Sequence, residues 1–112
     1  MGLTIKSPVK ELPGELVVSD PLTYPQLIEW REKLSEFIAK AAMKDTDYLK
    51  SEYEFAWPAI FAVAEKITIK GFESMNVEQI PSAPRKPIDK LLAHLITELR
   101  VYIRGEESIP KD

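Results

Sequence analysis

Hydrophobic and polar positions divide this 112-residue chain into an extended start and three amphipathic segments. In residues 1–22, Leu3 and Ile5 alternate with polar neighbours, and residues 16–18 form a short β-prone run. Between these two stretches, the Pro13-Gly14 pair supplies the backbone angles of a turn. Residues 1–22 are therefore predicted to form an extended arm or a loose β-hairpin.

The first amphipathic segment covers residues 24–43. Its apolar positions recur at helical spacing, namely Leu27, Trp30, Leu34, Phe37, Ile38 and Ala41. Thr23, followed three residues later by Gln26, matches the capping box that begins many helices. Pro25 in the first turn removes no helical hydrogen bond. The pattern predicts a helix over residues 24–43.

The second segment, residues 46–69, contains a proline in its middle. Its apolar stripe comprises Leu49, Tyr53, Ala56, Trp57, Ile60, Ala64 and Ile67. Pro58 cannot donate a helical hydrogen bond and disfavours α geometry at the residue before it. The stripe nevertheless keeps one phase on both sides of Pro58, which predicts a single helix bent there and ended before Gly71. Residues 55–64 are apolar nearly all round, as in a helix packed on several sides.

The third segment, residues 87–104, has the most regular pattern. Its apolar residues are Ile88, Leu91, Leu92, Leu95, Ile96, Leu99, Tyr102 and Ile103. Pro87 suits a first helical turn, and Gly105 suits a helix end. The chain is thus predicted to be a single all-α domain of three helices. Residues 1–22 form its arm, residues 23–105 its helical core, and residues 106–112 a loose tail.

Composition narrows the functional classes. Hydrophobic residues make up 45% and charged residues 29% of the chain, as in a folded globular domain. No cysteine is present, which excludes disulfides and thiolate metal sites. The net charge of −3 argues against general nucleic-acid binding and against anionic membranes. The longest apolar run is well short of the about 20 residues that a membrane span needs, and the start lacks a signal-peptide pattern. These features predict a cytoplasmic protein.

Candidate chemistry is sparse. His94 and Glu98 are spaced one helical turn apart, but two ligands are too few for a tight metal site. No serine stands in a Gly-x-Ser-x-Gly setting, and the 4 glycines form no phosphate-binding loop. The sequence predicts no enzymatic activity, no cofactor and no metal. One basic cluster, with Arg85, Lys86 and Lys90, leaves weak nucleic-acid binding as a third hypothesis.

Aromatic residues are more plentiful than a three-helix core of this size requires. Either the N-terminal arm covers one side of the central helix, or a partner protein or a second copy of the chain does. Four residues are candidates for such a protein interface: Phe55, Trp57, Phe61 and Phe72. Packing in the core is the alternative role for the same four residues.

The layout of several segments resembles small bacteriophage or prophage tail-region proteins, akin to tail assembly chaperones. The segments are residues 12–23 (LPGELVVSDPLT), residues 57–72 from WPAIF to IKGF, residues 80–87 (IPSAPRKP) and residues 105–107. The resemblance implies a helical protein of the host cytoplasm that binds an aggregation-prone tail component, such as the tape-measure protein. Self-association as a structural or regulatory protein is the alternative function.

Overall fold

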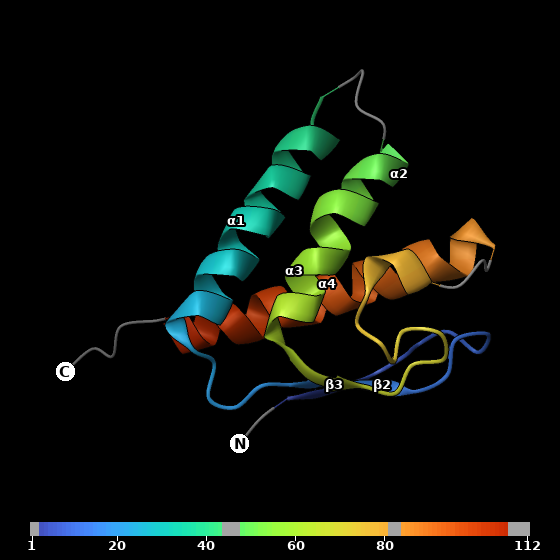
Figure 1. The fold of residues 1–112 in the computed structure, drawn as a ribbon, viewed down its shortest axis with the longest axis horizontal. Coiled ribbons are helices and arrows are strands. Elements are labelled where there is room, and N and C mark those ends of the chain that lie inside the picture. The colour runs from blue at the N-terminus through green and yellow to red at the C-terminus, as the bar shows by residue number, and fades with distance from the viewer. Residues whose placement is uncertain (1–2, 44–47, 81–83, 108–112) are drawn as a thin grey trace.

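The computed structural model describes residues 3–43, 48–80 and 84–107. Helix α1 lies beside a second helical segment, α4 contacts α3 in that segment, and a small sheet lies below the helices (Figure 1). The elements are β1 (Thr4–Lys6), β2 (Glu15–Val18), α1 (Tyr24–Ala41), α2 (Tyr48–Ser51), the π-helical turn η1 (Glu52–Ala56), α3 (Trp57–Val63), β3 (Ala64–Ile67), the 3₁₀ turn η2 (Val77–Gln79) and α4 (Arg85–Glu107).

The N-terminal arm is a β-hairpin within a three-stranded antiparallel sheet of order β1-β2-β3. Thr4 pairs with Val17 across the hairpin, and Leu16 pairs with Ile67 on the other side of β2. The hairpin that the sequence left as one of two options is therefore present. The all-α prediction is wrong, because the fold combines helices with a sheet.

The predicted helix over residues 46–69 is wrong in its last part, where the chain forms strand β3 instead. The helix ends at Val63, and Ala64 already has extended backbone angles, φ −82° and ψ 131°. The register of β3 against β2 shifts between Val17 and Val18, so one residue of β3 is unpaired. Because of this irregularity Ala64 and Ile67, three positions apart, are both buried. The same spacing is typical of a helix, which is why periodicity alone misassigned the segment.

Helical geometry continues through Pro58 by means of a wider turn. The backbone N–H of Trp57 donates to the carbonyl of Glu52, five residues earlier, at the end of η1. A proline ring in a regular α-helix clashes with the carbonyl four residues before it, here that of Glu54. The π-helical turn loosens the backbone at that point, and Pro58 then occupies the first turn of α3.

The two outer helices follow their predicted patterns with shifted ends. The capping box of α1 is complete, with Gln26 N donating to Thr23 Oγ1 at 3.3 Å and Thr23 N donating to Gln26 Oε1 at 2.9 Å. Helix α1 ends at Ala41 instead of residue 43. Helix α4 begins at Arg85 and runs through Gly105 to Glu107, so Gly105 does not end it. Residues 108–112 of the predicted tail lie outside the described residues.

One core joins the helices to the sheet. Leu91, Leu95 and Leu99 of α4 are fully buried, together with Leu16 of β2 and Ile60 of α3. In the described part of the chain, no helix is long and apolar enough to cross a membrane.

Gly14 is predicted to be essential to the sheet. It has φ +131°, and a Cβ added there would lie 2.6 Å from the backbone nitrogen of Ile69. Gly14→Ala should therefore lower the free energy of unfolding by about 1–3 kcal/mol or more. Gly105→Ala is the matched control, because its Cβ would meet nothing within 4 Å. In that helix the change should stabilise by up to about 1 kcal/mol. Urea unfolding gives the free energy of unfolding of both variants. Equal changes in the two variants would contradict the prediction for Gly14.

Candidate functional site

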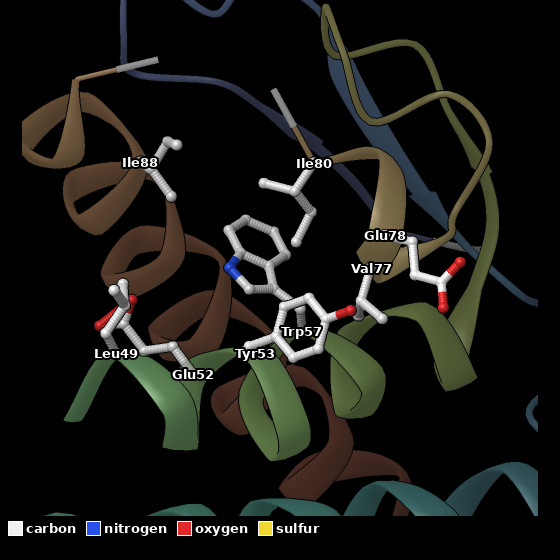
Figure 2. Close-up of a pocket in the computed structure, with 8 residues that line it drawn as sticks. All are labelled: Leu49, Glu52, Tyr53, Trp57, Val77, Glu78, Ile80 and Ile88. Atoms are coloured by element: carbon white, nitrogen blue, oxygen red, sulfur yellow. The ribbon is translucent and has the colours of Figure 1, made fainter. Parts of the chain in front are cut away.

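An open pocket of about 420 Å³ with a mostly apolar lining lies beside Trp57 and is called here the Trp57 pocket. Figure 2 shows the indole ring of Trp57 at its centre, with Tyr53 in front of it. The lining residues come from three parts of the fold: Leu49, Glu52, Tyr53 and Trp57 from the central helical segment, Val77, Glu78 and Ile80 from η2 and its end, and Ile88 from α4.

Trp57 forms a rigid floor. Its side chain is only 2% exposed. Its ring packs against Phe72 at a centroid distance of 4.7 Å and against Phe61 at 6.0 Å. Contacts of this kind add to the stabilisation from burial and limit ring motion. The pocket is therefore preformed around Trp57.

The walls are held by short local structures. In η2, Asn76 Oδ1 accepts a hydrogen bond of 2.9 Å from the backbone of Glu78, which fixes the turn that carries Val77 to the pocket. On the opposite side, Leu49 is 55% exposed and Tyr53 is 44% exposed. These two residues are one helical turn apart and form the open rim. Apolar side chains thus line the pocket and also extend out of it.

A buried acid lies at one end of the Trp57 pocket. Glu52 is only 3% exposed, and its Oε2 lies 3.7 Å from Nη2 of Arg85. Nε of Arg85 donates a 3.1 Å hydrogen bond to Oδ2 of Asp89, one turn further along α4. Two carboxyl groups therefore meet one guanidinium, and these three residues are called the Glu52 cluster. When both carboxyl groups are ionised, the buried oxygens Glu52 Oε2 and Asp89 Oδ1 have no hydrogen-bond donor among the described residues.

Burial is the main cause of an altered acidity at Glu52. Burial, followed by the hydrogen bond and charge of Asp89, raises the pKa of Glu52 to about 7, although Arg85 opposes the rise. A protonated Glu52 can donate to Asp89 Oδ1, so a single proton satisfies both unpartnered oxygens. The cluster therefore exchanges a proton near neutral pH.

Other chemistry is not assembled around the pocket. Within the described ranges, no group of three or more His, Cys, Asp or Glu residues is placed to hold a metal. His94 is half-buried on α4 and Glu98 is exposed, and neither lines the pocket. Arg85, a candidate for phosphate contact, instead pairs with Glu52 and Asp89.

The four aromatic interface candidates do not form one surface. Trp57 lines the pocket, while Phe72 is buried against its ring. Phe61 is half-buried and borders another depression, together with Pro58. Phe55 is half-buried towards α1, where Lys33 Nζ lies 5.8 Å from the centre of its ring. Of the four, only Trp57 lines the Trp57 pocket.

Glu52 is one of the pocket residues that sequence reasoning did not single out. It follows Leu49 by three residues and precedes Ala56 by four, so it falls on the apolar stripe of its helix. An acid on such a stripe is a signal, because a buried carboxyl group needs a partner. That partner, Asp89, is distant in the sequence and has no visible link to Glu52 before folding.

No protein-family model, no curated protein and no solved structure matches this chain. The resemblance to tail-region proteins therefore stays a prediction, and the functional proposal depends on the Trp57 pocket.

The Glu52 cluster predicts an unusual pH dependence of stability. The folded chain holds the proton of Glu52 more tightly than the unfolded chain, whose pKa is near 4.5. The stabilisation of the folded state by this proton is complete below pH 4.5 and is lost as the pH rises through about 7. Glu52→Gln mimics the protonated acid. In this variant, the decrease in the free energy of unfolding between low and high pH should be smaller by about 1–3 kcal/mol.

Chemical unfolding of both proteins between pH 4.5 and 8 measures the effect. Glu54→Gln is the control, because Glu54 is exposed and pairs with Lys50 at 3.6 Å. A wild-type difference between pH 4.5 and 8 that survives Glu52→Gln would contradict the assignment.

Proposed function

We propose that this protein is a non-enzymatic protein-binding protein that receives apolar side chains of another polypeptide in the Trp57 pocket. The observation that carries the proposal is the exposure of Leu49 and Tyr53 at the rim of a preformed apolar pocket with Trp57 as its floor. Tryptophan and tyrosine are the residue types most often found at the energetic centre of protein interfaces.

The size and lining of the pocket suit an inserted side chain. Six of its eight lining residues are aliphatic or aromatic, and Glu52 and Glu78 are the other two. Full burial of one leucine-sized side chain contributes about 1.5–3 kcal/mol. Scattered exposed apolar residues are ordinary on protein surfaces. Leu49 and Tyr53 differ because they stand one turn apart and border a cavity.

The geometry favours a helical partner segment. An amphipathic helix presents apolar side chains at three- and four-residue spacing, so one side chain can enter the pocket while a neighbour covers the rim at Leu49 and Tyr53. The sequence resembles tail assembly chaperones in layout. The partner of such a chaperone, the tape-measure protein, is a long helical polypeptide and would provide such a segment. That identity is part of the proposal.

Self-association has its own support in a different region. Tyr24 and Ile28 are one turn apart on α1 and are strongly exposed, and neither lines the Trp57 pocket. A second copy of the chain could cover them. Sedimentation measurements at tens of micromolar distinguish the two functions, because the partner-binding proposal needs no dimer.

Leu49→Asp is predicted to weaken binding of an apolar helix. The probe is a fluorescein-labelled synthetic peptide of about 20 residues with leucines at i, i+3, i+4 and i+7 and uncharged polar residues elsewhere. A charge at the rim should raise the Kd about tenfold or more, because it opposes burial of the inserted side chain. Fluorescence anisotropy gives the Kd of each variant.

Val101→Asp is the matched control, since Val101 is 71% exposed on α4 and lies outside the pocket. Its Kd should equal that of the wild type. The indole N–H signal of Trp57 in an NMR titration, assigned with a Trp30→Phe variant, locates the binding. A probe that fails to bind the folded wild-type protein, or that leaves this signal unmoved, would refute the proposal.

A further inference from the structure

Another depression of the surface, of about 490 Å³, adjoins the Trp57 pocket and is called here the Phe61 depression. Five of its seven lining residues are apolar and half-buried, and the other two are polar and exposed. They are Pro58, Phe61 and Ala62 of α3, Met75 and Asn76 ahead of η2, Val77 of η2, and Glu29 of α1.

The Trp57 pocket and the Phe61 depression meet at two points. Val77 lines both of them and lies at the end of the Trp57 pocket opposite Leu49 (Figure 2). The ring of Trp57, which is the floor of the pocket, packs against the ring of Phe61 at a centroid distance of 6.0 Å. The two hollows therefore form one groove between the central helical segment and the chain around η2.

The π-helical turn keeps the exposed apolar residues of the central segment in line. Its hydrogen bond spans five residues, so Pro58 falls on the side of the helix that Tyr53 occupies. Leu49 stands one turn before Tyr53, and Phe61 stands one turn after Pro58. The stripe from Leu49 to Phe61 is about 18 Å long. A single inserted side chain covers only part of it.

Met75 lines the groove in a strained backbone conformation. Its φ of 54° lies in the left-handed region, which residues other than glycine, asparagine and aspartate seldom adopt. Strain of this kind is concentrated at functional sites. The side chain is half-buried in the wall of the Phe61 depression, and methionine adapts to occupants of different shape. These features agree with a binding role for this wall.

The charges beside the groove indicate the kind of occupant. None of the residues that line either hollow is basic. Glu29 and Glu78 are exposed, and in the described part of the chain neither side chain has an ion-pair partner. Accessible acids beside an apolar groove are complementary to a row of apolar side chains with basic neighbours. An amphipathic helix with basic flanks has both features.

The spacing of the two hollows matches two turns of a partner helix. The residues of the central segment that line the Trp57 pocket lie within 49–57, and those that line the Phe61 depression lie within 58–62. The midpoints of these ranges are seven residues apart, or about 10 Å along the helix. Side chains at i and i+7 of a partner helix are separated by the same distance.

We infer that the polypeptide bound in the Trp57 pocket is an amphipathic helix with basic flanks that inserts a second apolar side chain, seven residues from the first, into the Phe61 depression. This inference rests on the proposed function and adds the length and the charge of the partner segment. It assigns Met75 as a specificity-determining residue of the second hollow.

The test compares two of the labelled amphipathic peptides, both with lysines beside the leucine row. The full peptide has leucines at i, i+3, i+4 and i+7, and the short-row peptide has serine at i+7. The full peptide should bind the wild-type protein about tenfold tighter, because its last leucine is buried in the Phe61 depression. Fluorescence anisotropy gives both Kd values.

Met75→Asn should remove this difference. Asparagine suits the left-handed backbone, so the variant keeps the loop and loses part of the apolar wall. Its Kd for the full peptide should rise about tenfold, while its Kd for the short-row peptide should not change. Ala62→Gln, on the opposite wall, should act in the same way. Met43→Asn is the matched control, because Met43 is 60% exposed and lines neither hollow. Indole N–H signals at their wild-type positions show that each free variant is folded.

The double variant Glu29→Gln and Glu78→Gln tests the basic flanks. It should bind the full lysine peptide about fivefold more weakly than the wild type does, because two accessible ion pairs are lost. A peptide with serines in place of the lysines should bind both proteins equally. Equal effects on the two peptides would contradict the charge of the partner.

Four outcomes decide the inference. Equal binding of the full and short-row peptides to the wild type would overturn it and leave the proposed function standing, since the Trp57 pocket needs only one side chain. The same loss for both peptides in Met75→Asn would overturn the assignment of Met75. A wild-type dimer at tens of micromolar that Met75→Asn dissociates would place a second copy in the groove and would also overturn the inference. Failure of every peptide to bind would refute the proposed function itself.

Discussion

The wide turn ahead of Pro58 is the constraint on which the rest of the structure depends. A proline at this position is incompatible with a regular helical turn before it, and the π-helical geometry of η1 relieves the conflict. The helix therefore continues instead of breaking. Its two halves carry Glu52 to the buried side and Trp57 into the centre of the fold. Both the core and the candidate site follow from that one local adjustment.

The Glu52 cluster lowers the stability of the folded chain. A buried carboxyl group beside a second one is unfavourable when both are ionised, and a single guanidinium does not satisfy both of them. An apolar residue in place of Glu52 would not create this conflict. Proteins commonly accept such a conflict where function requires it.

Rigid and exposed parts of the pocket serve different purposes. Trp57 is held by Phe72 and Phe61, so the floor keeps its shape without an occupant. The rim at Leu49 and Tyr53 projects outward from a short helical segment. A preformed floor lowers the entropic penalty of binding, and an exposed apolar rim provides the gain from burial. The proposed binding of a partner rests on these two features.

The sequence by itself determined the two outer helices, because regular apolar spacing and the Thr23 capping box act within a few residues of one another. It also singled out Trp57. Only the tertiary structure decided β3, because the spacing of Ala64 and Ile67 is that of a helix and fits a strand only with the register shift that forms where β3 pairs with β2. The same holds for Glu52, whose carboxyl group meets Asp89 across 37 positions of the chain. Local patterns reveal which residues seek burial, whereas the choice of partner depends on contacts that exist only after the chain has folded.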